Sequence, residues 1–260
     1  MSRWFQYKPF KSAVIHSNIF RTISLRNTLL LLLSLILNSS CYAQDKASGN
    51  FTVLTNNHTS LSITHFSGNT LSLRYNTLPG NQSGQNYNSF WFWRSSEVPW
   101  NTAPERMVML PQNATQSGSY VLDSISVNIL TSYIACYSLD STAKQICACS
   151  TLDGMTDSIT NSWVDISLLN VSANAIVFKY ETLPGYLPQA YGNWFGIWKG
   201  SASPYNYYPP LAQGVPLDNS SASTATLNNL SLEANQMYTL IYFLGSNPTT
   251  AAVIVTFLVQ

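Results

Sequence analysis

Charged residues are scarce in this chain. Asp, Glu, Lys and Arg make up 9% of its 260 residues, against about 25% in a typical soluble domain. Ser, Thr, Asn and Gln must therefore supply most of the polar surface. Neutralisation of phosphates requires clustered Lys and Arg, so this composition argues against nucleic acid as a partner.

Residues that carry common chemistry are also few. The chain has 3 histidines, and only His58 and His65 lie beyond the first 43 residues. No Gly-x-Ser-x-Gly elbow, Gly-x-Gly-x-x-Gly fingerprint or Walker sequence occurs. We therefore expect no cofactor, no metal ion and no enzymatic activity. A hydrolase of unrecognised type, acting through His65 or Glu181, is the alternative.

The first 43 residues are typical of an export signal. Five basic residues and no acidic one occur among them, and the apolar run Leu29–Leu37 is followed by small residues up to Ala43. This order predicts a secretory signal peptide, residues 1–43, and hence a secreted, periplasmic or cell-surface protein. Two alternatives stay open. One is an uncleaved anchor, although the run is shorter than the ~18 to 20 apolar residues of a spanning helix; the other is lipid attachment at Cys41.

Cleavage would leave an acidic mature chain. Five of the 12 basic residues lie in the leader, so residues 44–260 keep seven against 11 acidic ones, a formal net charge of −4. We expect no transmembrane span in this part. With 45% hydrophobic residues, the chain has enough apolar material for two cores of ordinary domain size.

An internal repeat organises the mature chain. The segment LSLRYNTLPG at 71–80 returns as IVFKYETLPG at 176–185, an offset of 105 residues. The offset continues without a gap to Leu139 and Leu244. A period near 100 is a domain length rather than a solenoid repeat. We therefore predict two tandem domains, residues 44–155 and 156–260, with a polar linker near Leu152–Ser162.

Each copy has the pattern of β-strands. Leu71, Leu73 and Tyr75 alternate with polar residues, and their counterparts 105 residues later keep the same phase. Turns rich in Gly, Pro, Asn and Ser separate such segments, and no helical periodicity bounded by caps appears. The pattern predicts an all-β fold of antiparallel β-sandwiches. The two Thr-Leu-Pro-Gly segments predict type II turns with a structural role.

Each copy ends in a predicted hairpin, and in the first copy this hairpin contains three cysteines. A turn at DSTAKQ places Cys136 opposite Cys147, close enough for a disulfide in an exported protein. The second copy has Ile241 and Ala252 there, so the bridge would belong to one domain only. A metal site at Cys147 and Cys149 is the alternative, but no further Cys or His cluster completes a tetrahedral set.

The second copy resembles a known family. GNWFGIWKG at 192–200, preceded by FKYETLPG and followed by SPYNYY and YTLIYFLGSN, is similar to the SKICH domain, an immunoglobulin-like sandwich. Asn193 stands where that family has an acid, and the first copy keeps Phe90 and Trp93 but not the glycine. The resemblance implies two tandem immunoglobulin-like domains with a non-enzymatic role in localisation or protein interaction.

The aromatic residues divide into two groups according to the repeat. Four positions are aromatic in both copies, and we expect them in the cores: Phe90 with Phe195, Trp93 with Trp198, Tyr133 with Tyr238, and Tyr137 with Tyr242. Other aromatic residues differ between the copies or lie in loops beside proline. Six of these are candidate ligand-binding residues: Trp91, Trp100, Trp194, Tyr205, Tyr207 and Tyr208.

Exposed rings flanked by amides and hydroxyls suit a sugar, because a ring packs on apolar C–H faces while amides bond hydroxyl groups. We hypothesise that the protein binds a glycan or another surface ligand through these six residues. The same residue types serve as anchors in protein interfaces, so a protein-interaction or assembly component of the SKICH type is the first alternative. The other possibility is that the rings pack on their own domain.

Overall fold

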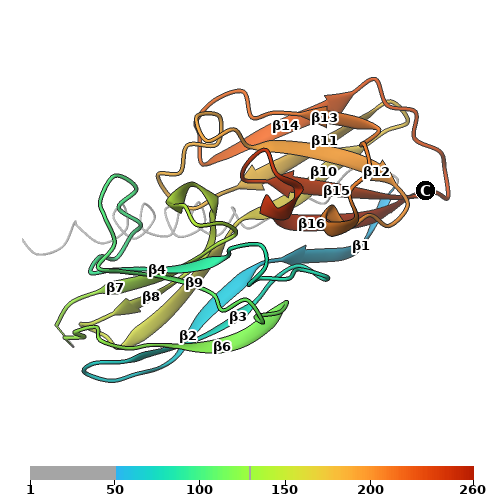
Figure 1. Ribbon diagram of the computed structural model, residues 1–260. Coiled ribbons are helices and arrows are strands. Elements are labelled where there is room, and N and C mark those ends of the chain that lie inside the picture. Colours follow the sequence, from blue (N-terminus) through green and yellow to red (C-terminus); the bar gives the residue numbers. More distant parts are fainter. Residues whose placement is uncertain (1–50, 129) are drawn as a thin grey trace, which may run out of the picture. The chain divides into compact units, whose positions relative to one another are not determined.

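The computed structural model describes residues 51–128 and 130–260, which consist of β-strands, turns and loops (Figure 1). The predicted signal peptide and Cys41 lie outside the described residues. The first eight strands are β1 (Phe51–His58), β2 (Ser60–Phe66), β3 (Leu71–Asn76), β4 (Ser89–Trp93), β5 (Arg106–Met109), β6 (Ser117–Leu122), β7 (Tyr133–Ser138) and β8 (Ile146–Asp153). They are followed by β9 (Ser158–Trp163), β10 (Asp165–Val171), β11 (Ala175–Glu181), β12 (Trp194–Lys199), β13 (Ala212–Gly214), β14 (Ala222–Asn228), β15 (Met237–Phe243) and β16 (Ala251–Val259). Short 3₁₀ turns are η1 (Ala143–Gln145), η2 (Pro204–Asn206) and η3 (Pro248–Thr250).

The strands form four antiparallel sheets that make two immunoglobulin-like sandwiches. The first sandwich consists of the sheet β2-β3-β6 and the sheet β5-β4-β7-β8-β9. The second consists of β10-β11-β14 and β13-β12-β15-β16-β1. Strands β2 to β8 and strands β10 to β16 occupy matching positions at the offset of 105 residues and have the same neighbours. The predicted all-β antiparallel sandwich fold is confirmed.

Three of the four shared aromatic positions lie in the main core, as the repeat predicted, whereas Trp93 and Trp198 are buried in separate clusters that each include a leucine of the opposite sandwich. All eight residues of the four shared aromatic positions are buried. Two buried amides lie among them: the side-chain oxygen of Asn88 accepts a hydrogen bond from the Tyr137 hydroxyl at 2.9 Å, and that of Asn193 accepts one from the Tyr242 hydroxyl at 3.0 Å. These pairs are 105 residues apart, so each core contains the same polar contact.

Strands β1 and β9 join the two sandwiches. They occupy the same repeat position, and each pairs with the last strand of a repeat: β1 with β16, and β9 with β8. The registers match, since His58 stands opposite Val253 and Trp163 opposite Ala148. The chain then passes to the other sandwich through a single residue, Thr59 after β1 and Val164 after β9. In Figure 1, β1 lies beside β16 and continues into β2.

The segment predicted as a linker is instead part of a hairpin. Residues 152–162 contain the end of β8, a turn at 154–157 and most of β9, and Leu152 pairs with Ile159. Polar side chains occur here because β9 is exposed along its whole length, so a polar composition did not distinguish an edge strand from a linker. The domain ranges 44–155 and 156–260 stay a prediction.

The predicted disulfide is wrong in one partner. Cys136 is bonded to Cys149, and Cys147 is a free, buried thiol. The reason is a β-bulge: Tyr137 pairs with Ala148 and Ser138 with Ile146, which leaves Cys147 as the extra residue. Its side chain packs in the main core, whereas Cys136 and Cys149 pack together on the other face of the sheet.

The two Thr-Leu-Pro-Gly turns also connect the sandwiches. Gly80 and Gly185 have φ of +88° and +72°, as a type II turn requires. Leu78, from the first turn, is buried among Trp198, Ile241 and Phe243 of the second sandwich. Leu183, from the second turn, is buried among Trp93, Cys136 and Cys149 of the first. Each turn therefore inserts one leucine into the other sandwich.

Candidate functional site

Trp91 and Trp194 pack on their own sheets. The Trp91 ring stacks on Trp93 at 5.7 Å between centroids, and its Nε1 donates to the Ser89 hydroxyl at 2.8 Å. The Trp194 ring stacks on Phe243 at 3.9 Å, and its Nε1 donates to the Gly245 carbonyl at 2.9 Å. Both rings are half-buried, so little of either is left for a ligand.

Trp100 and Tyr205 face the turns of the opposite sandwich. Trp100 Nε1 donates to the Pro184 carbonyl at 2.8 Å. Tyr205 packs with Leu78 and lies against Gly80, where an added Cβ would come within 3.5 Å of its ring. Burial raises the pKa of Tyr205, and its hydroxyl has no hydrogen-bond partner among the described residues. These two side chains hold the sandwiches together.

Tyr207 and Tyr208 are the two exposed members of the predicted set, at 45% and 44% relative exposure. Both follow η2 and are supported by Trp198. Trp198 Nε1 donates to the Tyr208 carbonyl at 2.7 Å, and the Tyr207 ring meets the Trp198 ring edge-on at 6.3 Å. The Tyr208 hydroxyl donates to the Lys199 carbonyl at 3.4 Å. The buried Trp198 thus supports the Tyr207 ring and the Tyr208 backbone at the surface.

A groove of about 370 Å³ lies beside Tyr208. Thr55 and Asn57 of β1 and Ile254 and Thr256 of β16 form one part of its wall. Residues Ser201, Ala202, Ser203 and Asn206 of the β12–β13 loop, together with Pro79, form the rest. None of these side chains is charged. The groove therefore combines one aromatic ring with amides and hydroxyls, which together can contact both the C–H face and the hydroxyl groups of a sugar.

Sequence reasoning identified the loop of this groove but not its other wall. Tyr207 and Tyr208 were found because their repeat counterparts, Thr102 and Ala103, are not aromatic. Thr55 and Asn57 come from the distant strand β1, and nothing in their local sequence marks them. Their place in the groove depends on the pairing of β1 with β16.

The first sandwich has a smaller counterpart of the groove. A pocket of about 80 Å³ is lined by Ser96, Glu97, Val98, Thr151, Ser162 and Pro184, among others. These residues stand 105 positions before or after residues of the larger groove. Glu97 and Val98 replace Ala202 and Ser203, and no exposed tyrosine stands beside them. The two sites therefore differ, and of the two only the groove beside Tyr208 is lined by a tyrosine.

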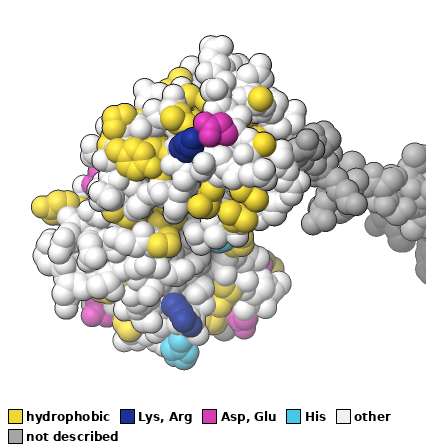
Figure 2. Space-filling model, turned by 90° about the vertical axis from the view of Figure 1, so that its right-hand side faces the viewer, with side chains coloured by type: hydrophobic (Ala, Val, Ile, Leu, Met, Phe, Trp, Pro, Cys, Tyr) yellow, Lys and Arg dark blue, Asp and Glu magenta, His cyan; other side chains and the backbone are white. Residues whose placement is uncertain are grey.

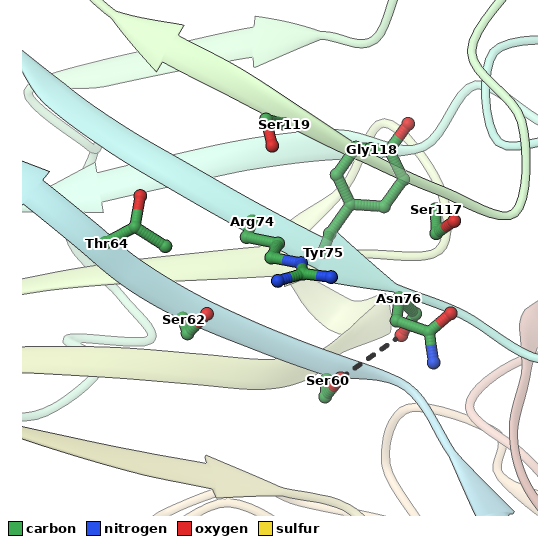
Figure 3. A pocket seen from close by; sticks show the side chains of 9 residues that line it. All are labelled: Ser60, Ser62, Thr64, Arg74, Tyr75, Asn76, Ser117, Gly118 and Ser119. Carbon is green, nitrogen blue, oxygen red and sulfur yellow. Dashed lines mark hydrogen bonds between the residues drawn. The ribbon is translucent and has the colours of Figure 1, made fainter.

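A larger hollow of about 930 Å³ lies on the outer face of the sheet β2-β3-β6 (Figure 3). Hydroxyl side chains from β2 and β6 surround the guanidinium of Arg74. Tyr75 also lines it, but its ring is buried under Gly118, where an added Cβ would come within 2.8 Å of the Tyr75 hydroxyl. The hollow therefore has polar groups but no exposed aromatic face.

The two residues considered for catalysis lie on strands of different sandwiches, His65 on β2 and Glu181 on β11. His65 is exposed, and Glu181 forms an ion pair with Lys179. In residues 51–128 and 130–260, no three His, Cys, Asp or Glu side chains are grouped so as to hold a metal ion. No helix in the same ranges is long and apolar enough to cross a membrane. On the face in Figure 2 a basic side chain lies against an acidic one in the upper part, the other charged side chains are scattered, and no Lys or Arg cluster appears.

Comparison with known proteins finds likeness in fold only. No family model matches the chain, and no curated protein matches it. The FN1–FN3 domains of chicken CNTN1 are similar over 76% of this chain and 67% of that one, with 13% identity and a TM-score of 0.24. A DUF3823 family protein from Bacteroides ovatus is similar over 76% of this chain and 95% of that one, with 12% identity and a TM-score of 0.26. At such identities and scores, neither likeness bears on function.

Proposed function

We propose that this protein is a secreted, non-enzymatic binding module that holds a neutral glycan in the groove beside Tyr208. The observation that carries the proposal is the groove itself, where an exposed aromatic ring stands beside amide and hydroxyl side chains. Secretion rests on the leader-like N-terminal sequence. The absence of charged side chains from the groove wall favours a neutral sugar over a sialylated or sulfated one.

Each part of the groove has a role in this proposal. The Tyr208 ring provides an apolar face on which the C–H side of a sugar ring packs; Trp198 holds its backbone carbonyl, and its hydroxyl donates to the Lys199 carbonyl. The side-chain amides of Asn57 and Asn206 can donate and accept hydrogen bonds with sugar hydroxyls. Tyr207 extends the aromatic surface beyond the groove. Trp91, Trp100, Trp194 and Tyr205 support the scaffold rather than the ligand.

A glycan array probed with residues 44–260 tests the proposal. We expect selective binding by the parent chain and its loss, by at least about tenfold, in Tyr208→Ala and in Asn57→Ala. Leu217→Ala is the matched control, because Leu217 is 88% exposed in the same sandwich and does not line the groove. Circular dichroism must be unchanged in all variants. A blank array, or binding that survives both groove substitutions, contradicts the proposal.

A protein-interaction role of the SKICH type is the second candidate. Leu211, Val215 and Leu217, which flank the short edge strand β13, are 57%, 59% and 88% exposed. A protein partner can pair a strand with such an exposed sheet edge, or cover its apolar side chains. In this case, pull-down from a host extract recovers a partner with the parent chain and with Tyr208→Ala, but not with Leu217→Ser.

A further inference from the structure

The pairing of β1 with β16 is a long-range contact that covers a sheet edge. Strand β16 is apolar and almost wholly buried, and it carries no charged residue. Six of the eight residues of β1 are exposed, so backbone hydrogen bonds and few side-chain contacts hold the strand. Phe51 meets Phe257 edge-on at 6.4 Å, and the Asn56 amide donates to Asp165 at 3.1 Å.

Strand β9 makes the same contact in the first sandwich, but locally. The turn at 154–157 closes β8 and β9 into a hairpin. In the second sandwich no hairpin joins the paired strands, because β1 precedes the whole first sandwich and β16 ends the second. The two strand pairs have matching registers. They differ because a short turn joins β8 to β9, whereas β1 and β16 lie at opposite ends of the described chain.

This difference allows β1 to be replaced by an identical strand. If β1 leaves β16, it exposes an uncharged apolar edge, which favours pairing with another strand. The strand that fits this edge in register and side chains is β1 of a second copy. Exchange of an identical element between copies preserves the contacts of the closed form and changes only the hinge, which here is Thr59.

We propose that the chain forms a strand-exchanged dimer in which β1 of each copy pairs with β16 of the other. The groove beside Tyr208 contains Thr55 and Asn57 of β1, so each groove of the dimer is built from both chains. If the proposed function holds, the dimer presents two grooves and binds multivalent glycans more tightly than the monomer. The exchange itself does not depend on that function.

Cysteine substitutions at paired positions test the exchange. Thr55 pairs with Thr256, and both side chains face the groove. One preparation of residues 44–260 carries Thr55→Cys and another carries Thr256→Cys. They are mixed at high concentration, warmed to just below the unfolding transition, cooled and oxidised. We expect a disulfide-linked species of twice the chain mass on a non-reducing gel, and we expect peptide mapping to place the bond between positions 55 and 256.

The repeat supplies a matched control. Thr160 pairs with Thr151 in the hairpin of β9 and β8, at the same repeat positions. A mixture of Thr160→Cys and Thr151→Cys chains is expected to give no linked dimer. The double variant Thr55→Cys/Thr256→Cys must close its internal bond, which shows that the positions can react. The proposal is overturned if the double variant closes but the 55/256 mixture stays unlinked, or if both mixtures link equally.

Discussion

The imidazole of His58 lies flat on the indole of Trp163, with ring centroids 4.7 Å apart and planes within 5° of parallel. The two residues are 105 positions apart, so they occupy the same place in the repeat. Each comes directly before a crossover residue, Thr59 or Val164. The stacked pair therefore joins the two strands at the point where the chain changes sandwich.

This position predicts a pH-dependent stability. Burial lowers the pKa of His58 below its ordinary value of 6.5, and the nearby carboxylate of Asp165 opposes this effect. A lowered folded-state pKa gives a stabilising contribution that is complete above the unfolded-state pKa and is lost as pH falls through the folded one. We expect the free energy of unfolding to decrease between pH 7 and pH 5.

Urea unfolding at several pH values measures this effect. His58→Asn removes the titrating group and should flatten the profile. His65→Asn, which replaces an exposed histidine, should leave the profile unchanged. Parallel curves for the parent chain and His58→Asn would show that this histidine does not link stability to pH.

Leu78 and Leu183 are predicted to stabilise the contact between the two sandwiches. Each is buried in a cluster of the other sandwich, at 0% and 1% relative exposure. Truncation of such a leucine to alanine costs about 2 to 5 kcal/mol through lost burial and the cavity left behind. Denaturant unfolding of Leu78→Ala and Leu183→Ala should therefore show this loss. Leu187→Ala, at a position 39% exposed, should cost clearly less.

The repeat predicted most of the core because the alternation of apolar residues and the match between the two copies can both be read from short stretches of sequence. Tyr137 and Tyr242 were placed in the core by their matching positions, and both are fully buried. The pairing of β1 with β16 of the second sandwich was not predictable. The local alternation of a strand sets which side chains face the core, but it does not show which sheet edge the strand joins. The bulge at Cys147 was not predictable either, since one extra residue in a strand has no distinct sequence pattern here.

The candidate site was predictable only where its residues carry a local sequence signal. Tyr207 and Tyr208 depart from the repeat, and that departure is visible in the sequence. Trp100 and Tyr205 lie beside prolines in the same loops, yet they contact turns of the opposite sandwich. Whether a loop aromatic faces solvent or a neighbouring domain depends on how the domains pack, which the local sequence did not reveal.

The buried amides are predicted to stabilise each core. Asn193 accepts from the Tyr242 hydroxyl and donates to the Tyr186 hydroxyl at 2.9 Å. Asn193→Ala leaves the buried Tyr242 hydroxyl without a partner, at an expected cost of about 1 to 3 kcal/mol, whereas the Tyr186 hydroxyl still donates to the Lys144 carbonyl at 2.6 Å. Tyr242→Phe in the same background should recover part of the loss, because it removes an orphaned hydroxyl. A double-mutant cycle by urea unfolding measures the coupling, and additive losses would exclude it.

The next prediction concerns the three cysteines of the first sandwich. Burial raises the pKa of the Cys147 thiol, so the reactive thiolate is suppressed in the folded chain. A maleimide should label no cysteine of folded residues 44–260, one after denaturation without reductant, and three after reduction. Mass spectrometry of unreduced peptides should find Cys136 joined to Cys149. A label at Cys149 in the denatured, unreduced chain would instead indicate a Cys136–Cys147 bond.

The same bond is predicted to contribute to stability. It closes a short loop, with a sequence separation of 13 residues, and loops of this length correspond to about 3 kcal/mol in the chain-entropy account of disulfides. Cys136→Ala/Cys149→Ala should lower the free energy of unfolding of the chain by that order. The second sandwich folds the equivalent hairpin with Ile241 and Ile254, so the bond is not required for the fold. Loss of all β-structure in the double variant would contradict that inference.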